Sequence, residues 1–265
     1  MQHYELIAIV QLSSTNYQTP PTQLSVNRDP SVTNQSQPSL GILALETGRA
    51  PGAPSTLPNS VFNPATFDFP TIAEMVPGAW VDRVVPGDST LESSYIAAAQ
   101  RLVERGAVAI TSDCGFTIRH QAAVSAAVKV PVAMSSLLLV PLLLRQLPPK
   151  GKLAVLTFDS KHCGEDLLGL AGRSERERVI IGGIEDGTTW QNEMKRPSIP
   201  TTVAEIESDI AGCISQLRAA HPEIAAVLLE CTMFPVAAPA IRRMTGLPVY
   251  DTATLYRMTF ASVAS

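Results

Sequence analysis

The feature that most constrains this chain is a segment that occurs twice. Each copy is an apolar run that leads into a cysteine, Cys114 in the first copy and Cys231 in the second. A proline follows each cysteine after 17 residues (131 − 114 and 248 − 231) and lies between apolar residues. A hydroxyl residue lies four positions beyond each proline, at Ser135 and Thr252. The repetition indicates one structural unit used twice, with a thiol at the same place in both copies.

Strand-like and helix-like patterns alternate in the same order in the two halves. Short apolar runs are typical of buried parallel strands, and they occur at residues 41–46, 107–112, 152–157 and 225–230. Helical patterns begin at Ser/Thr-x-x-Glu capping boxes and cover residues 89–105 and 202–220. Such alternation predicts parallel sheets flanked by helices. We expect an α/β fold of two pseudo-symmetric domains, with the active site in the cleft between them.

The repeat also predicts the domain boundaries. Residues 1–39 read as an N-terminal arm, because most of them are Ser, Thr, Asn, Gln and Pro. The first α/β domain is expected to comprise residues 40–145 together with the tail 247–265. The second domain is expected to comprise residues 146–246. A long Pro/Gly-rich loop at residues 47–70 belongs to the first domain, and loops of that length in compact domains are usually functional.

Composition excludes several classes of partner. The net charge is −4 and no basic stripe is present, which argues against nucleic acid. The cysteines form no CxxC pair and no Cys/His cluster, so no metal site is expected. The most apolar stretch, residues 134–144, is too short to span a membrane and contains a proline. The N-terminus lacks the pattern of a signal peptide. We expect a cytoplasmic protein that binds a small molecule and that could form a homo-oligomer.

The two repeated cysteines are the candidate catalytic residues. Cys114 and Cys231 follow predicted strands, and open parallel sheets bind ligands beyond these strand ends. The next residues, Gly115–Phe116 and Thr232, are expected near helix N-termini, where backbone N–H groups hold a carboxylate and lower a thiol pKa. A thiolate would then be available near neutral pH. Two other cysteines, at 163 and 213, lack this context and are expected to be packing residues.

Five further residues are weaker candidates. Glu46 and Asp113 are placed to orient or deprotonate the thiols. Solvated acids at strand ends are an equally good explanation of both. Thr47, Thr66 and Thr157 are expected to contact polar groups of the substrate, although threonine is common at strand ends and turns.

The sequence resembles the aspartate/glutamate/hydantoin racemase superfamily over about residues 40–255. The resemblance implies a cofactor-independent enzyme in which one cysteine removes the proton α to a carboxylate or amide. A second cysteine then reprotonates the opposite face. Cys114 and Cys231 match these cysteines, and Gly115, Phe116 and Thr232 match the carboxylate-binding positions. The motifs that carry the resemblance are GILALET (41–47), NPATF (63–67), DCGF (113–116), SSLLLVPLLL (135–144) and ECTMFP (230–235).

The resemblance leads to an expected function with two alternatives. We expect a racemase or epimerase, an isomerase that acts on a small amino-acid-like or hydantoin-like carboxylate or amide. One alternative is a single-thiol isomerase or decarboxylase of the same fold, similar to maleate isomerase or arylmalonate decarboxylase. The other is a non-catalytic binder of a small ligand. Glutamate racemases typically carry a histidine two residues after the second cysteine, and Met233 at this position argues against glutamate as the substrate.

Overall fold

The structure is a computed structural model that describes residues 37–48 and 55–264. Nearly all of the expected N-terminal arm (1–39) lies outside the described residues, as does part of the 47–70 loop.

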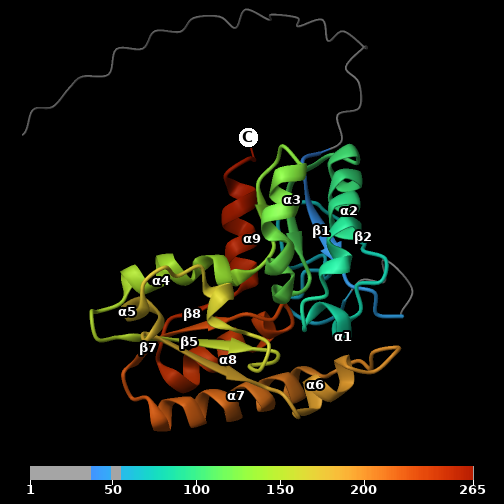
Figure 1. The fold of residues 1–265 in the computed structure, drawn as a ribbon. Helices are drawn as coiled ribbons and strands as arrows, with labels where there is room; N and C mark the ends of the chain where they lie inside the picture. The colour runs from blue at the N-terminus through green and yellow to red at the C-terminus, as the bar shows by residue number, and fades with distance from the viewer. Residues whose placement is uncertain (1–36, 49–54, 265) are drawn as a thin grey trace, which may run out of the picture. The chain divides into compact units, whose positions relative to one another are not determined.

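Two parallel sheets with the same topology form the centre of the described chain (Figure 1). The first has the strand order β2-β1-β3-β4 and the second the order β6-β5-β7-β8. The expected α/β class with two repeated halves is therefore confirmed. The strands of the first sheet are β1 (Ser39–Ala44), β2 (Thr71–Met75), β3 (Ala107–Ser112) and β4 (Val132–Ala133). The strands of the second sheet are β5 (Lys152–Thr157), β6 (Val179–Gly183), β7 (Ile224–Leu229) and β8 (Val249–Tyr250).

Helices flank both sheets, as the alternation of patterns predicts. In the first half, α2 packs against β1, β2 and β3. In the second half, α7 packs against β5 and β6. Within the described ranges no helix has the length and apolar character needed to cross a membrane. The helices are α1 (Val81–Val84), α2 (Glu92–Glu104), α3 (Gln121–Ala127), α4 (Val140–Gln146), α5 (Arg173–Arg176), α6 (Thr188–Glu193), α7 (Val203–Ala220), α8 (Ala238–Thr245) and α9 (Thr252–Ala261).

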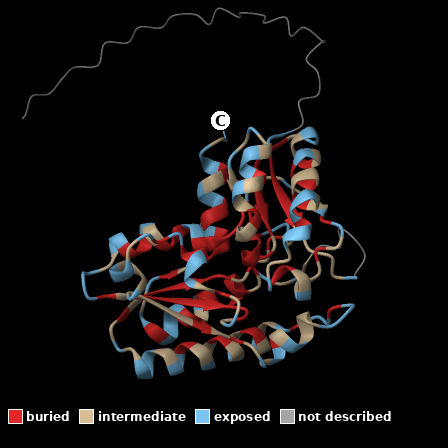
Figure 2. Cartoon of the chain, in the orientation of Figure 1, coloured by how far each residue is buried: buried red, intermediate tan, exposed pale blue. Residues whose placement is uncertain are grey.

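The hydrophobic core of each half is centred on the two middle strands of its sheet. The apolar side chains of β1, β3, β5 and β7 are almost all buried, because helices cover the sheets (Figure 2). The long helices α2 and α7 bury one face, and their other faces are exposed. The continuous apolar runs in the sequence reflect this burial of strands on both faces.

One of the two expected capping boxes is present. Thr202 begins α7: its hydroxyl accepts from the Glu205 N–H at 3.3 Å, and the Glu205 carboxylate accepts from the Thr202 N–H at 2.7 Å. The prediction of a capping box at Ser89 is wrong. Asp88, one residue earlier, caps instead, accepting from the Thr90 N–H at 2.9 Å, and a 3₁₀ turn (Ser89–Leu91) precedes α2.

The C-terminal tail links the second sheet to the first. The short strand β8 pairs with β7 in the second sheet. The following helix, α9, packs against β3 and β4 of the first sheet, and its Tyr256 hydroxyl donates to the Ser112 carbonyl at 2.5 Å. The chain thus returns to the first half after residue 250.

Candidate active site

A cavity of about 840 Å³ lies at the carboxyl ends of the strands and is lined by residues of both halves. We call it the thiol cavity, because Cys114 and Cys231 both line it. Cys114 is buried and lies one residue beyond Asp113, which follows β3. Cys231 is partly exposed and lies one residue beyond Glu230, which follows β7. The structure therefore brings together the two thiols that the sequence repeat singles out.

Asp113 is fixed by the strand that lies beside its own. Its backbone N–H donates to the Leu43 carbonyl of β1 at 3.1 Å. Its carboxylate oxygens both lie 3.0 Å from the N–H of Leu45, the residue after β1, which donates to them. Burial raises the pKa of Asp113 to about 7, because desolvation disfavours the charged form. Asp113 is thus a partly buried acid immediately before the first thiol.

Glu230 repeats this arrangement in the second half. Its backbone N–H donates to the Leu156 carbonyl of β5 at 2.8 Å. Its Oε2 accepts from the Thr157 hydroxyl at 2.9 Å and from the Phe158 N–H at 3.4 Å. Its Oε1 is buried and has no hydrogen-bond partner among the described residues. Burial raises the pKa of Glu230 to about 7.

Glu230 is a site residue that the sequence analysis missed. The signal was present, since Asp113 and Glu230 both directly precede a repeated cysteine. The two acids differ in length, which hid their equivalence.

The pKa values of the two thiols are higher than the sequence predicts. Backbone N–H groups of Phe116 and Thr117 do approach Cys114, and that of Met233 approaches Cys231, and these groups lower the thiol pKa as expected. Burial is the larger effect, followed by the nearby Glu230 charge, and both raise the pKa. The net result is a pKa well above the ordinary value of 9.0 for both thiols. The expectation of a thiolate near neutral pH is therefore wrong.

The remaining predicted residues divide into two groups. Gly115, Phe116, Thr232 and Thr47 line the thiol cavity. The Thr232 hydroxyl also donates to the backbone carbonyl of Asp113, which joins the two halves beside the thiols.

The other three lie outside the cavity lining. Thr157 is buried and holds Glu230 rather than facing the cavity. Thr66 is buried in its own loop, where its hydroxyl donates to the Ser60 carbonyl at 2.5 Å. Glu46 accepts from the Gly78 N–H at 2.8 Å. It lines a second, small pocket.

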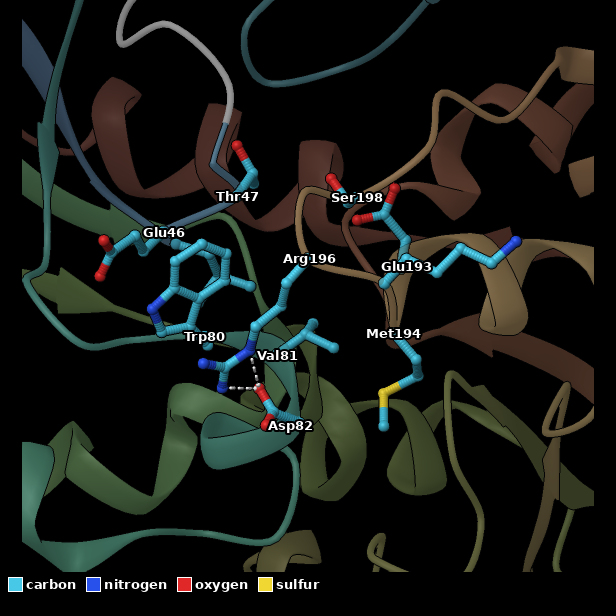
Figure 3. A pocket seen from close by; sticks show the side chains of 11 residues that line it. Glu46, Thr47, Trp80, Val81, Asp82, Glu193, Met194, Arg196 and Ser198 are labelled. Carbon is cyan, nitrogen blue, oxygen red and sulfur yellow. Dashed lines mark hydrogen bonds and ion pairs between the residues drawn. The ribbon is translucent and has the colours of Figure 1, made fainter.

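That small pocket marks a contact between the two halves (Figure 3). Residues 194–201, between α6 and α7, run from the second half toward α1 and β1; we call them the crossing segment. The Arg196 guanidinium donates to the Asp82 carboxylate and lies 4.6 Å from the centre of the Trp80 ring. The Ser198 N–H donates to the Thr47 carbonyl at 3.1 Å.

The crossing segment also borders the thiol cavity. Pro200 and Thr201, at its end, line that cavity together with Glu193, which precedes the segment. The contacts of Arg196 therefore hold part of the cavity wall in place.

A doubled parallel α/β fold with a thiol at a strand end of each half defines the class of protein. It is the fold of the aspartate/glutamate/hydantoin racemase superfamily. An arylmalonate decarboxylase structure is 17% identical with a TM-score of 0.52, covering 86% of this chain and 93% of that one. A glutamate racemase from Francisella tularensis subsp. tularensis SCHU S4 is 15% identical with a TM-score of 0.51, covering 85% and 80%. Identities this low show the fold alone.

Sequence comparison identifies the family within this class. No family model matches the chain. A dimethylsulfoniopropionate lyase from Durusdinium sp. clade D is 30% identical over 238 residues, which are 84% of this chain and 73% of the relative. Dimethylsulfoniopropionate lyase 3 from Emiliania huxleyi (strain CCMP1516) is 26% identical over 89% of this chain and 63% of the relative. The chain belongs to the dimethylsulfoniopropionate lyase family.

This finding corrects the expected activity. The relatives are named lyases, so the expectation of a racemase or epimerase, and with it the isomerase class, is wrong. The reason is chemical. A base beside an acidic C–H determines that a proton is removed, whereas the substrate determines which bond breaks afterwards.

Proposed function

We propose that this chain is a lyase that cleaves dimethylsulfoniopropionate. The observation that carries the proposal is a cavity with two thiols, each directly preceded by an acid, in a chain 30% identical to a relative named for this activity. The substrate has a carboxylate, two methylene groups and a dimethylsulfonium group. Its α-proton is of the kind that the thiols of this fold are expected to remove.

The proposed reaction is an elimination. A thiolate takes the proton from the carbon next to the carboxylate. The electron pair of that C–H bond forms the double bond to the adjacent carbon, and the pair of the C–S bond leaves with sulfur. The products are acrylate and neutral dimethyl sulfide, and the proton stays on the thiol until it passes to solvent. Charge and atoms balance without a redox partner.

An elimination needs only one base, whereas racemisation needs one on each face. We assign the proton removal to Cys231, because it is the more exposed of the two cavity thiols. Cys114, at 8% exposure, forms part of the cavity wall.

The substrate's own charge helps to ionise the base. Burial raises the pKa of both thiols and so favours their protonated form. A sulfonium cation placed near a thiol favours the thiolate, since an opposite charge within about 4–6 Å stabilises the charged form. The same cation is attracted to the acids Asp113 and Glu230 and to the aromatic faces of lining residues such as Phe116 and Phe158. A cationic substrate therefore suits this cavity better than a neutral one.

Product analysis tests the proposal. Purified chain is incubated with dimethylsulfoniopropionate, and the mixture is followed by proton NMR with headspace gas chromatography. We expect acrylate and dimethyl sulfide in equal amounts. Formation of 3-hydroxypropionate instead of acrylate would show displacement by water and contradict the elimination. Absence of dimethyl sulfide would reject the substrate.

A further inference from the structure

The two acids that precede the repeated cysteines differ in one respect that bears on proton transfer. Asp113 uses both carboxylate oxygens within its own half, where they accept from the Leu45 N–H. Glu230 is one methylene longer and uses only Oε2 in its own half. Its Oε1 extends to the other half and occupies the space beside Gly115, where a Cβ would lie 1.9 Å from it.

The position of this oxygen places the Glu230 carboxyl group beside the residue that follows Cys114. Gly115 directly follows Cys114, and Glu230 directly precedes Cys231. Glu230 is among the residues that line the thiol cavity, and its Oε1 is buried. A buried oxygen without a partner is costly unless it receives a proton or a hydrogen bond. The charge of Glu230 acts on both cavity thiols, and these are the groups that the reaction must deprotonate.

We propose that Glu230 is the positioning residue that takes the proton from the cavity thiols, through Oε1, before the thiolate attacks the substrate. The transfer converts S–H and carboxylate into thiolate and carboxylic acid, so no other reactant is needed. Oε2 keeps its bonds to Thr157 and Phe158 in both states, which holds the group in place. This inference rests on the proposed lyase activity for its kinetic test only.

Other ionisable groups face this region and enter the expected pH dependence. The charge of Glu230 opposes ionisation of four neighbours, and Asp113 and Glu193 add to this effect at the thiols. Arg119 lies near Cys163 and acts in the opposite direction. The four neighbours are Cys114, Cys163, Cys231 and Tyr256.

Burial places the pKa of Glu230 at about 7, below that of the thiols. The acid limb of activity in the native protein is therefore expected to follow Glu230 rather than a thiol. Below this limb Glu230 is protonated and cannot accept the thiol proton. Above it the carboxylate is available at a pH where free thiols are still protonated.

The first test is the pH dependence of kcat/KM for dimethylsulfoniopropionate in the native protein and three variants. Glu230→Gln keeps the shape but cannot take a proton, and Glu230→Asp keeps the charge but is too short to reach Gly115. In both, the limb near pH 7 should move above pH 8.5, with rate rising about tenfold per pH unit below it. Glu104→Gln, the same change at an exposed site on α2, should leave the profile unchanged. If kcat/KM fell by the same factor at every pH in both Glu230 variants, the proposal would be overturned.

The second test needs no lyase activity. Iodoacetamide labelling of Cys114 and Cys231 is followed by mass spectrometry between pH 6 and 10. If a thiol and Glu230 share a proton, they titrate together as a pair. The labelling rate of the native protein should then rise to a plateau above pH 7. In Glu230→Gln the plateau should be replaced by a rise of about tenfold per pH unit. A plateau that persists in Glu230→Gln would refute proton sharing. A protein that shows the plateau without releasing dimethyl sulfide would refute the lyase alone.

Discussion

The carboxyl group of Glu230 fills the space that a side chain at position 115 would need. A Cβ on Gly115 would lie 1.9 Å from Oε1 and 2.7 Å from the backbone carbonyl oxygen of Glu230. The first contact is with a side chain and the second is with backbone, so a rotamer change alone does not relieve both. The two halves thus pack in direct contact beside the thiols.

Gly115→Ala is therefore expected to destabilise the protein by roughly 1–3 kcal/mol, the usual cost of overpacking a well-packed site. Urea unfolding measures it. Gly212→Ala is the matched control, because a Cβ on Gly212 in α7 would have no heavy atom within 4 Å. The free energy of unfolding of Gly212→Ala should rise by about 0.5–1 kcal/mol, since glycine in a helix interior is destabilising relative to alanine. Equal stability of the two variants would show that Gly115 is not constrained by Glu230.

Glu230→Gln should make stability less dependent on pH. The pKa of Glu230 is about 7 in the folded protein against an ordinary value of 4.5. Its contribution to stability is therefore complete below pH 4.5 and is lost as pH rises through 7. Relative to the native protein, the variant should gain up to roughly 3 kcal/mol between pH 4.5 and 8. Denaturant midpoints at several pH values measure this gain, and a pH-independent difference would contradict the raised pKa.

The contact between Arg196 and Asp82 should matter for catalysis through the crossing segment. Arg196→Asp replaces attraction by repulsion and removes the stacking on Trp80, so kcat/KM should fall roughly tenfold. The double variant Arg196→Asp with Asp82→Arg restores an ion pair of opposite polarity. This double variant should recover part of the lost kcat/KM. The double-mutant cycle gives the coupling free energy between residues 82 and 196. Strictly additive losses would show that the pair does not hold the cavity wall.

The sequence contained the information for most of the architecture. Strand β3 has the predicted bounds of 107–112, and the cap at Thr202 is where the capping box predicts. Both follow from local rules that hold because burial and capping depend on neighbouring residues. The cap at Asp88 was missed because aspartate and serine are both good N-cap residues and lie side by side.

The site was only partly predictable. The repeat identified Cys114 and Cys231, but the balance between N–H groups and burial at each thiol depends on packing that no local pattern reports. Glu230 was missed because its role depends on Gly115, which is distant in sequence. The proposed elimination could not be predicted from the site residues, because its leaving group belongs to the substrate.

The most direct test of the account is the rate of dimethyl sulfide release by single cysteine variants at saturating dimethylsulfoniopropionate. Cys231→Ser should lower the rate at least about 1,000-fold, because the serine hydroxyl is a far weaker acid than a thiol. Cys213→Ser, at a cysteine on α7 that does not line the cavity, should keep the native rate. Release of dimethyl sulfide at a near-native rate by Cys231→Ser would contradict a thiol-based elimination at this site.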